Sequence, residues 1–283
     1  MCNNKDEIEI TSVEDFIKTL DDINTVYNSD AKCCFKIKSG YFRGQASKRW
    51  DVSAGIFRNN IDEISLYTKA FSIAWKELTD CSTYLEKLVK LQHYRLKTRL
   101  LDITFNPLVA LYFACEEVDN NSNIEDGVVY WGYKLTQNTS LDIAEFGLNF
   151  LIKNGDKDIF PSVTLSGISC SKLAALTTPQ LVLSPLNNNR IEAQNGAFIM
   201  HPVLKKTQDI YVSNFEQRNS LKNCFEKQYI IPQQYKKGII RTLNIIGINK
   251  ASLFPELEYK LQHLNNKFAI EKSLDIKPTI KII

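Results

Sequence analysis

The chain has 283 residues, of which 44% are hydrophobic and 24% charged, and its formal net charge is +3. This length and hydrophobic content allow a large core, near the upper size of one cooperative domain. The small net charge provides no electrostatic footprint for nucleic acid unless basic residues cluster locally. Composition alone therefore indicates no particular partner and no oligomeric state.

Seven cysteines are scattered along the sequence without a C-x-x-C pair, which favours reduced thiols and argues against a thiolate metal site. The N-terminal residues are charged where a secretory signal is apolar, and no apolar run approaches the roughly 20 residues that span a bilayer. The Walker A, G-x-G-x-x-G and H-E-x-x-H motifs are absent. We therefore expect a cytoplasmic protein without a membrane partner or a metal.

In the first third of the chain, Ser12 with Asp15 forms a shortened capping box that predicts a helix beginning at Thr11 or Ser12. Residues 34–44 alternate apolar and basic side chains and predict a strand, with Arg43 at its C-terminal edge. Apolar residues then recur at helical spacing from residue 61 to about residue 90. This pattern predicts one long helix, or two helices joined near Asp80.

A polar segment precedes the most apolar part of the chain. Residues 98–103 are compatible with a strand, and Asn106 and Pro107 then match the N-cap and the first position of a helix. Residues 108–115 are apolar on every face of such a helix. We therefore expect this helix to be long, buried and central to the fold.

Further elements are predicted along the second half of the chain. They are a strand at 127–133, a mostly helical insertion at 140–183, an Asn-rich turn and strand at 187–202, a strand at 224–231, and helices at 233–246 and 256–265. Strands and helices do not alternate regularly, which favours an α+β fold over doubly wound α/β. The prediction is a single mixed domain with a small central sheet, packed with the long buried helix and surrounding helices.

Four blocks of the sequence carry a resemblance to a known family. They are Tyr41–Gln45 with its Phe-Arg-Gly element, residues 92–114, residues 190–198 and residues 247–257. In this order they resemble the FRG domain family. The resemblance implies an FRG domain at 35–265, a helical extension at 1–34 and a tail at 266–283. It also implies a bacterial or phage-encoded protein in a phage- or defence-related setting, and it supplies no reaction.

Arg43 is the first candidate for a functional site. An arginine beside Gly44 presents a planar fork of donors next to backbone that a ligand can approach closely, which suits a phosphate or carboxylate. The alternative is an internal ion pair with Asp102 or Glu192. Gln45, on the same turn, is a candidate ligand-binding residue or a stabiliser of the turn.

His93 is the leading titratable candidate, because its pKa permits proton transfer near neutral pH. Its neighbours Gln92 and Tyr94 are candidate ligand-binding residues. The alternative for His93 is a cap on the last carbonyls of its helix. Asp102 has two predicted partners: it orients His93, or it pairs with Arg43.

Three further residues complete the predicted site. Thr98 and Arg99 are candidate ligand-binding residues, and Arg99 and Asp102 should lie on opposite faces of a strand. Gln194 precedes the turn dipeptide Asn195-Gly196 and is a candidate catalytic residue. We expect Arg43, Arg99 and Gln194 to line one shared pocket that is open to solvent.

Two classes of function remain open. Arg43, Tyr94 or Thr98, and Gln194 or Glu192 follow the order of the residues that hold NAD in ADP-ribosyltransferases. In that reading Arg43, His93, Asp102 and Gln194 are catalytic, and NAD is the candidate cofactor. The alternative is a non-catalytic sensor whose pocket, lined by Arg43, Arg99 and Gln194, recognises a phosphorylated nucleotide, nucleic acid or a partner protein. The basic run around Tyr94 is a candidate surface for nucleic acid in this reading.

Overall fold

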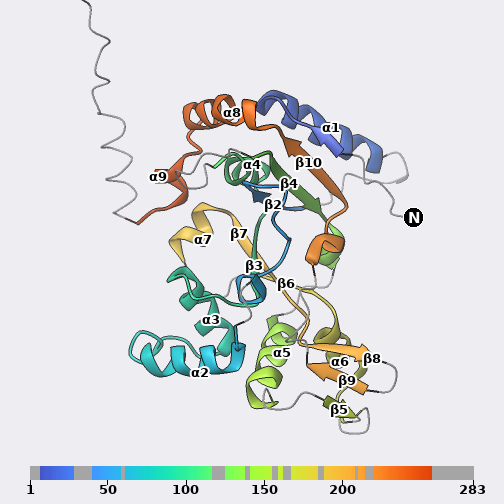
Figure 1. Cartoon of the computed structure of the whole chain (residues 1–283), viewed down its shortest axis with the longest axis vertical. Coiled ribbons are helices and arrows are strands. Elements are labelled where there is room, and N and C mark those ends of the chain that lie inside the picture. The colour runs from blue at the N-terminus through green and yellow to red at the C-terminus, as the bar shows by residue number, and fades with distance from the viewer. Residues whose placement is uncertain are drawn as a thin grey trace, which may run out of the picture.

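The computed structural model describes residues 7–28, 40–58, 61–116, 125–137, 141–154, 159–161, 167–183, 188–207, 210–213 and 220–256. Within these residues the chain forms one α+β domain, as predicted. Helices gather at both ends of a twisted, mixed sheet (Figure 1). Among the described helices, none is long and apolar enough to cross a membrane.

The central sheet has seven strands in the order β1-β10-β4-β2-β3-β7-β6, and it is larger than the small sheet that the sequence predicted. Among the described strand pairs of this sheet, only β1–β10 is parallel. The strands are β1 (Glu7–Glu9), β2 (Tyr41–Gln45), β3 (Leu100–Thr104), β4 (Gly127–Gly132), β6 (Gln180–Val182), β7 (Gly196–Met200) and β10 (Lys227–Ile231). A separate antiparallel sheet contains β5 (Ile159–Pro161), β8 (Leu204–Thr207) and β9 (Ile210–Ser213).

Helices pack on the sheet in two groups. The first group, α1 (Val13–Asn28), α4 (Pro107–Cys115) and α8 (Gln233–Ile245), shares an apolar cluster with β2, β4 and β10. The second group, α2 (Glu63–Ile73), α3 (Tyr84–His93), α5 (Leu141–Asn154) and α6 (Cys170–Thr177), packs against β3, β6 and β7. The short helix α7 (Asn189–Ala193) packs beside β7, and the short helix α9 (Lys250–Leu253) contacts α7 and lies between it and α8 (Figure 1).

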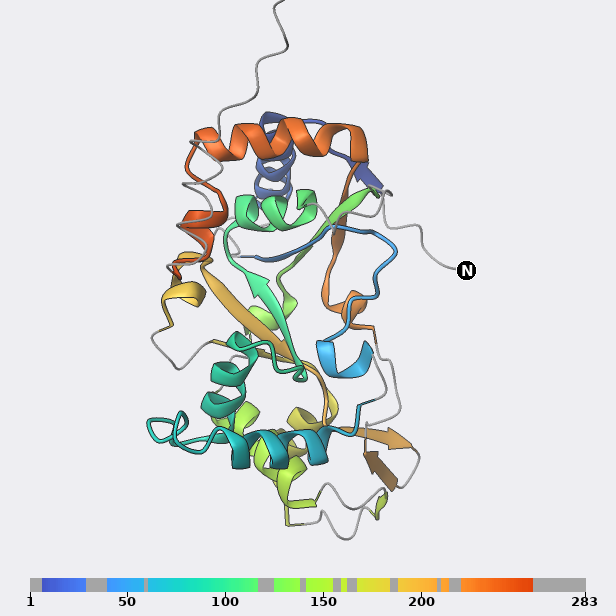
Figure 2. The same ribbon diagram turned by 60° about the vertical axis from the view of Figure 1, so that its left-hand side comes forward.

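The sheet is nearly split between β2 and β3. These two strands share a single register position, Phe42 with Thr104, whereas β3 pairs with β7 at five positions and β2 pairs with β4 at five. Figure 2 shows β2 and β3 diverging from their point of contact. The divergence leaves backbone groups of β3 without a strand partner on the β2 side and opens a space between the two helical groups.

Helix α4 closes the floor of this space. The Asn106 side chain accepts hydrogen bonds from the backbone N–H groups of Leu108 (3.0 Å) and Val109 (3.4 Å), so the predicted cap is confirmed. The helix is central and largely buried, although at nine residues it is short rather than long. Gly44 lets it approach β2, because a Cβ at this position would lie 1.8 Å from the carbonyl oxygen of Ala110. The glycine of the Phe-Arg-Gly element is therefore required by helix packing.

Several predicted boundaries change in the structure. The predicted cap by Ser12 is confirmed, since the backbone N–H of Asp15 donates to the Ser12 hydroxyl over 3.0 Å. The capping box is shifted by one residue on its other side, where the Asp15 carboxylate accepts from the backbone N–H of Thr11 over 2.9 Å. Two helices, α2 and α3, replace the alternative of one long helix. Arg43 lies in the middle of β2 and not at its edge, because pairing with β4 continues to Gln45. The predicted strand residues 34–39, the helix at 256–265 beyond residue 256, and the tail at 266–283 lie outside the described residues.

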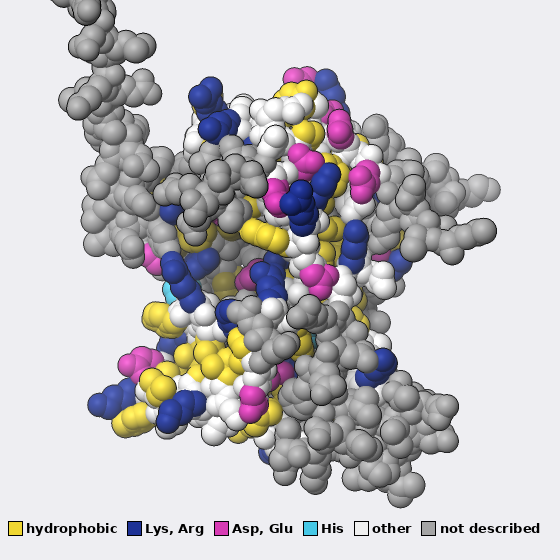
Figure 3. All heavy atoms as spheres, in the orientation of Figure 1, with side chains coloured by type: hydrophobic (Ala, Val, Ile, Leu, Met, Phe, Trp, Pro, Cys, Tyr) yellow, Lys and Arg dark blue, Asp and Glu magenta, His cyan; other side chains and the backbone are white. Residues whose placement is uncertain are grey.

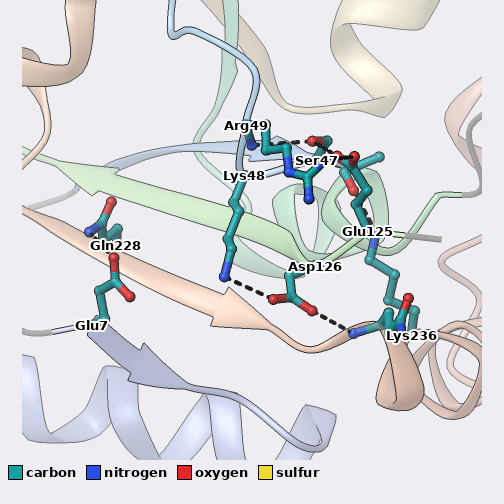
Figure 4. A network of polar contacts seen from close by, with 10 residues as sticks. Glu7, Ser47, Lys48, Arg49, Glu125, Asp126, Gln228 and Lys236 are labelled. Atoms are coloured by element: carbon teal, nitrogen blue, oxygen red, sulfur yellow. Dashed lines mark hydrogen bonds and ion pairs between the residues drawn. The ribbon is translucent and has the colours of Figure 1, made fainter. Parts of the chain in front are cut away.

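A polar network joins the loop after β2 to the beginnings of β4 and α8 (Figure 4). Lys48 pairs with Asp126 (2.9 Å), and Arg49 pairs with Glu125 (2.9 Å). Asp126 also accepts a hydrogen bond from the first backbone N–H of α8, at Gln233 (3.1 Å). Each cation drawn there has a carboxylate or a carbonyl partner. The network therefore has a structural role and holds the loop after β2 against the beginnings of β4 and α8.

Candidate functional site

The space between the helical groups contains a cavity of about 420 Å³. In the space-filling view, Lys and Arg side chains gather around a hollow between the α4 and α2/α3 layers (Figure 3). The cavity walls come from β2, β3, β7, α3, α4, α7 and the residue after α9. Its charged and aromatic side chains are Arg43, Arg95, Arg190, His93, Asp102, Phe42, Phe113, Phe198 and Phe254.

Arg43 lies in the gap between β2 and β3. Its Nη1 donates to the backbone carbonyl of Asp102 over 2.6 Å, which replaces a strand-to-strand hydrogen bond that the divergence removes. Its Nε is shielded from solvent and has no hydrogen-bond partner among the described residues. Burial lowers the pKa of Arg43 to about 10, while nearby Asp102 opposes that shift. The guanidinium is therefore charged at neutral pH and only partly compensated.

Asp102 is the one exposed residue in an otherwise buried strand, because its side chain lies on the cavity wall. Its Oδ1 accepts a hydrogen bond from the Gln92 amide over 2.8 Å. The Oε1 of Gln92 in turn accepts a hydrogen bond from the hydroxyl of Thr98. This chain of contacts fixes which atom of the Gln92 amide faces Asp102 and holds the carboxylate in place.

Two more arginines reach the cavity from opposite sides. Arg95 follows α3 and has a φ of +69°, a left-handed conformation that is uncommon for a residue with a side chain. Arg190 comes from α7, and its guanidinium carbon lies 4.5 Å from the centre of the Phe254 ring. Stacking of this kind leaves the edge of the guanidinium available for polar contacts.

His93 and Gln194 lie on the same cavity but face different partners. The Nε2 of His93 is 3.4 Å from a carboxylate oxygen of Glu256, so the predicted His93–Asp102 pair is wrong. Gln194 forms the C-cap of α7, and its Nε2 donates to the carbonyl of Leu253 over 3.1 Å. Its backbone carbonyl accepts a hydrogen bond from the Thr104 hydroxyl over 2.6 Å. Gln194 therefore ties β3 to α9 while its side chain lines the wall.

The structure does not place Arg99 in the cavity, so the expected pocket of Arg43, Arg99 and Gln194 is corrected. Arg99 is 0% exposed and forms a salt bridge with Glu63 of α2, which is also buried. Its Nε donates to Glu63 Oε1 over 2.7 Å, and its Nη1 donates to the carbonyl of Pro202 over 2.9 Å. The carboxylate and carbonyls satisfy the guanidinium, so Arg99 joins α2 to the chain after β7.

Three other predicted ligand-binding residues also lie outside the cavity lining. Gln45 is buried, and its Nε2 donates to the carbonyl of Asp51 over 3.3 Å. Thr98 is buried beneath Gln92 and acts on the cavity only through that residue. Tyr94 is 68% exposed and lines a neighbouring hollow. Gln45 shares a strand face with Arg43 but lies two positions further along β2, outside the cavity lining.

The predicted ion pairs of Arg43 are replaced by the contact with the Asp102 backbone. Glu192 is exposed on α7 and does not line the cavity. Among the described residues, no group of three or more His, Cys, Asp or Glu side chains is arranged to hold a metal ion. The cavity thus combines three cations and one carboxylate with phenylalanine walls, an arrangement suited to a ligand with an anionic group and a flat ring.

The predicted site residues did not include several charged and aromatic residues of the lining, among them Arg95, Arg190, Phe113 and Phe254. Arg95 lies in the basic run around Tyr94, and Arg190 opens the third block of the family resemblance. These positions were therefore visible as sequence features. The sequence did not show that these residues converge on one cavity, because α7 and α9 reach it only through the packing of the two helical groups.

Comparison with known proteins adds one finding. The family model of the FRG domain matches residues 38–123, which include β2, α2, α3, β3 and α4. Neither the curated proteins nor the solved structures contain a significant match. The match covers Arg43, His93, Arg95 and Asp102, whereas Arg190, Gln194 and Phe254 lie beyond it.

Proposed function

We propose that this protein, whose residues 38–123 form an FRG domain, binds a phosphorylated nucleotide in the cavity beside Arg43. The observation that carries the proposal is the incompletely compensated charge of Arg43. Its Nε atom is shielded from water and has no hydrogen-bond partner among the described residues. A phosphate would supply the missing acceptors, since guanidinium and phosphate oxygens match in charge and in geometry.

The other walls support a nucleotide rather than a bare phosphate ion. Arg95 and Arg190 add positive charge, and Phe113, Phe198 and Phe254 provide flat apolar surface for a base. Asp102, held by Gln92, is placed to accept a hydrogen bond from a sugar hydroxyl. A cavity of about 420 Å³ lies within the size range of small-molecule sites.

Transfer chemistry like that of ADP-ribosyltransferases, with NAD as the nucleotide, is the second candidate. His93 beside Glu256 supports it, because a histidine and a carboxylate 3.4 Å apart at the cavity can move a proton. Two observations count against it. The Gln194 amide nitrogen is engaged by the Leu253 carbonyl, and Glu192 lies outside the cavity lining. In the phage- or defence-related setting that the family resemblance implies, binding alone would make the protein a nucleotide sensor.

Calorimetric titration with AMP, ADP, NAD, inorganic phosphate and uncharged adenosine tests the proposal. We expect the nucleotides to bind and adenosine to bind at least about tenfold more weakly, because it lacks the charged hydrogen bonds. Arg43→Gln should weaken nucleotide binding by about ten- to hundredfold. Nicotinamide release from NAD, measured in parallel, separates transfer from binding.

Arg49→Gln is the matched control. Arg49 follows β2 like Arg43, but its side chain is 79% exposed and pairs with Glu125 outside the cavity. This variant should bind nucleotides as the unmodified protein does. Equal binding of adenosine and AMP, or equal losses in the two variants, would show that Arg43 does not recognise phosphate.

A further inference from the structure

A second hollow lies directly beside the Arg43 cavity. It has a volume of about 340 Å³ and shares the lining residues His93, Asn188 and Arg190 with the first cavity. The two hollows therefore meet at these residues and form one groove. We refer to the second one as the Tyr94 hollow.

The chemistry of the Tyr94 hollow differs from that of the Arg43 cavity. Its lysine, Lys90, is paired with Asp80 over 2.6 Å, so these two charges offset each other. Tyr94 is 68% exposed and meets the His93 ring edge-on at 5.3 Å, which leaves a large part of its own ring uncovered. Asn189 adds an exposed side-chain amide. This hollow favours a polar aromatic ring over a phosphate.

The backbone at Arg95 connects the two hollows. Tyr94 lines one hollow and Arg95 lines the other, although they are neighbours in the chain. The left-handed φ of +69° at Arg95 turns the chain between them. This conformation belongs to a Schellman motif that ends α3, in which the backbone N–H groups of Arg95 and Leu96 donate to the carbonyls of Gln92 (2.9 Å) and Leu91 (3.0 Å). The turn sends an arginine and an aromatic ring into adjacent parts of one groove.

We infer that the ligand contains two nucleosides joined by a phosphate bridge. This inference rests on the proposed nucleotide binding at Arg43. One base lies against the phenylalanine walls, the bridge lies near Arg43 and Arg190, and the second base stacks on Tyr94. Both a pyrophosphate-linked dinucleotide and the end of an oligonucleotide provide this chemistry.

Calorimetric titration with ADP, diadenosine 5′,5′-diphosphate and the phosphodiester dinucleotide pApA tests the inference. Base stacking on an aromatic side chain contributes about 1–3 kcal/mol, so at least one dinucleotide should bind about five- to hundredfold more tightly than ADP. Tyr94→Leu should remove this gain and leave ADP binding unchanged. Preference for the diphosphate identifies a pyrophosphate-linked ligand, and preference for pApA identifies an oligonucleotide end.

Trp75→Leu is the matched control, because Trp75 is also an exposed aromatic residue (62%) but lines neither hollow. It should leave the binding of all three ligands unchanged. If ADP binds as tightly as both dinucleotides, or if Tyr94→Leu weakens all three equally, the two-nucleoside ligand is excluded while nucleotide binding stands. If none of the three binds, nucleotide binding and its extension are both excluded.

Discussion

Two arginines near the same strand show opposite ways of placing a charge inside a protein. Arg99 is fully buried, forms a salt bridge with the Glu63 carboxylate and donates hydrogen bonds to the carbonyls of His201 and Pro202. Arg43 donates to one carbonyl, that of Asp102, and its Nε has no hydrogen-bond partner among the described residues. Burial alone therefore does not identify a binding residue. An arginine that faces a cavity with an unpartnered, shielded donor and an incompletely compensated charge is a stronger indication of a ligand.

The difference originates in strand pairing. Leu100, which follows Arg99, pairs with Met200, and the regular β3–β7 ladder holds Arg99 against the chain after β7. Arg43 lies where β2 leaves β3 after one shared register position, Phe42 with Thr104. Because the strands separate there, Arg43 faces the cavity and has few hydrogen-bond partners. Three predictions test whether Arg99 is structural and Arg43 is reserved for a ligand.

The largest effect is expected for Arg99→Met. It leaves the Glu63 carboxylate buried without its partner, which should lower the free energy of unfolding by about 3–5 kcal/mol. Urea unfolding measures this change. The double variant Arg99→Met with Glu63→Leu should recover most of the loss, because it removes both charges together. A single variant as stable as the unmodified protein would contradict the structural role of Arg99.

A second effect is expected from His201, next to Arg99. Burial, and to a lesser degree Arg99, lowers the pKa of His201 to about 3, and its Nε2 accepts a hydrogen bond from the backbone of Ala54 over 3.0 Å. The unfolded chain binds this proton near pH 6.5, whereas the folded protein does not. Stability should therefore decrease as the pH falls below about 6.5, by up to about 1.4 kcal/mol per pH unit.

Unfolding free energies at pH 7, 6 and 5 measure this slope. His201→Gln removes the titrating group and keeps an acceptor for the Ala54 N–H, so its slope should be smaller. The same slope in both proteins would show that other groups cause the pH dependence. Above pH 6.5, the histidine contributes no slope, because it is neutral in both states.

The smallest effect on stability is expected for Arg43→Met. This change loses one hydrogen bond to the Asp102 carbonyl and also removes a poorly compensated charge, so the free energy of unfolding should change by less than about 1 kcal/mol. Urea unfolding under the conditions used for Arg99→Met provides the comparison. A loss as large as that of Arg99→Met would assign Arg43 to the core of the fold and remove the contrast between the two arginines.

Much of the local structure followed from the sequence, since short-range chemistry decides it. Asn106 and Pro107 predicted the start of α4, because a cap and a first-turn proline act within a few residues. Ser12 with Asp15 predicted the start of α1 for the same reason. Gly247, with a φ of +86°, ends the α8 region where the sequence placed a stop.

The membership of the candidate site was harder to predict. Arg43, Arg99 and Gln194 looked alike as polar residues at the ends of predicted elements, but Arg99 is satisfied by Glu63, which lies 36 positions earlier in the chain. Arg190 and Phe254 reach the cavity from α7 and from the end of α9. Such contacts depend on the packing of distant segments, and no local pattern encodes them.

The sequence by itself determined the α+β class, the caps and the buried helix α4, because hydrophobic periodicity and capping act over a few residues. Tertiary structure alone decided which arginine carries an incompletely compensated charge. That outcome depends on where β2 separates from β3 and on which carboxylate α2 brings to Arg99. Compensation of a buried charge is a property of its three-dimensional neighbours, so it appears only when the strands and helices are assembled.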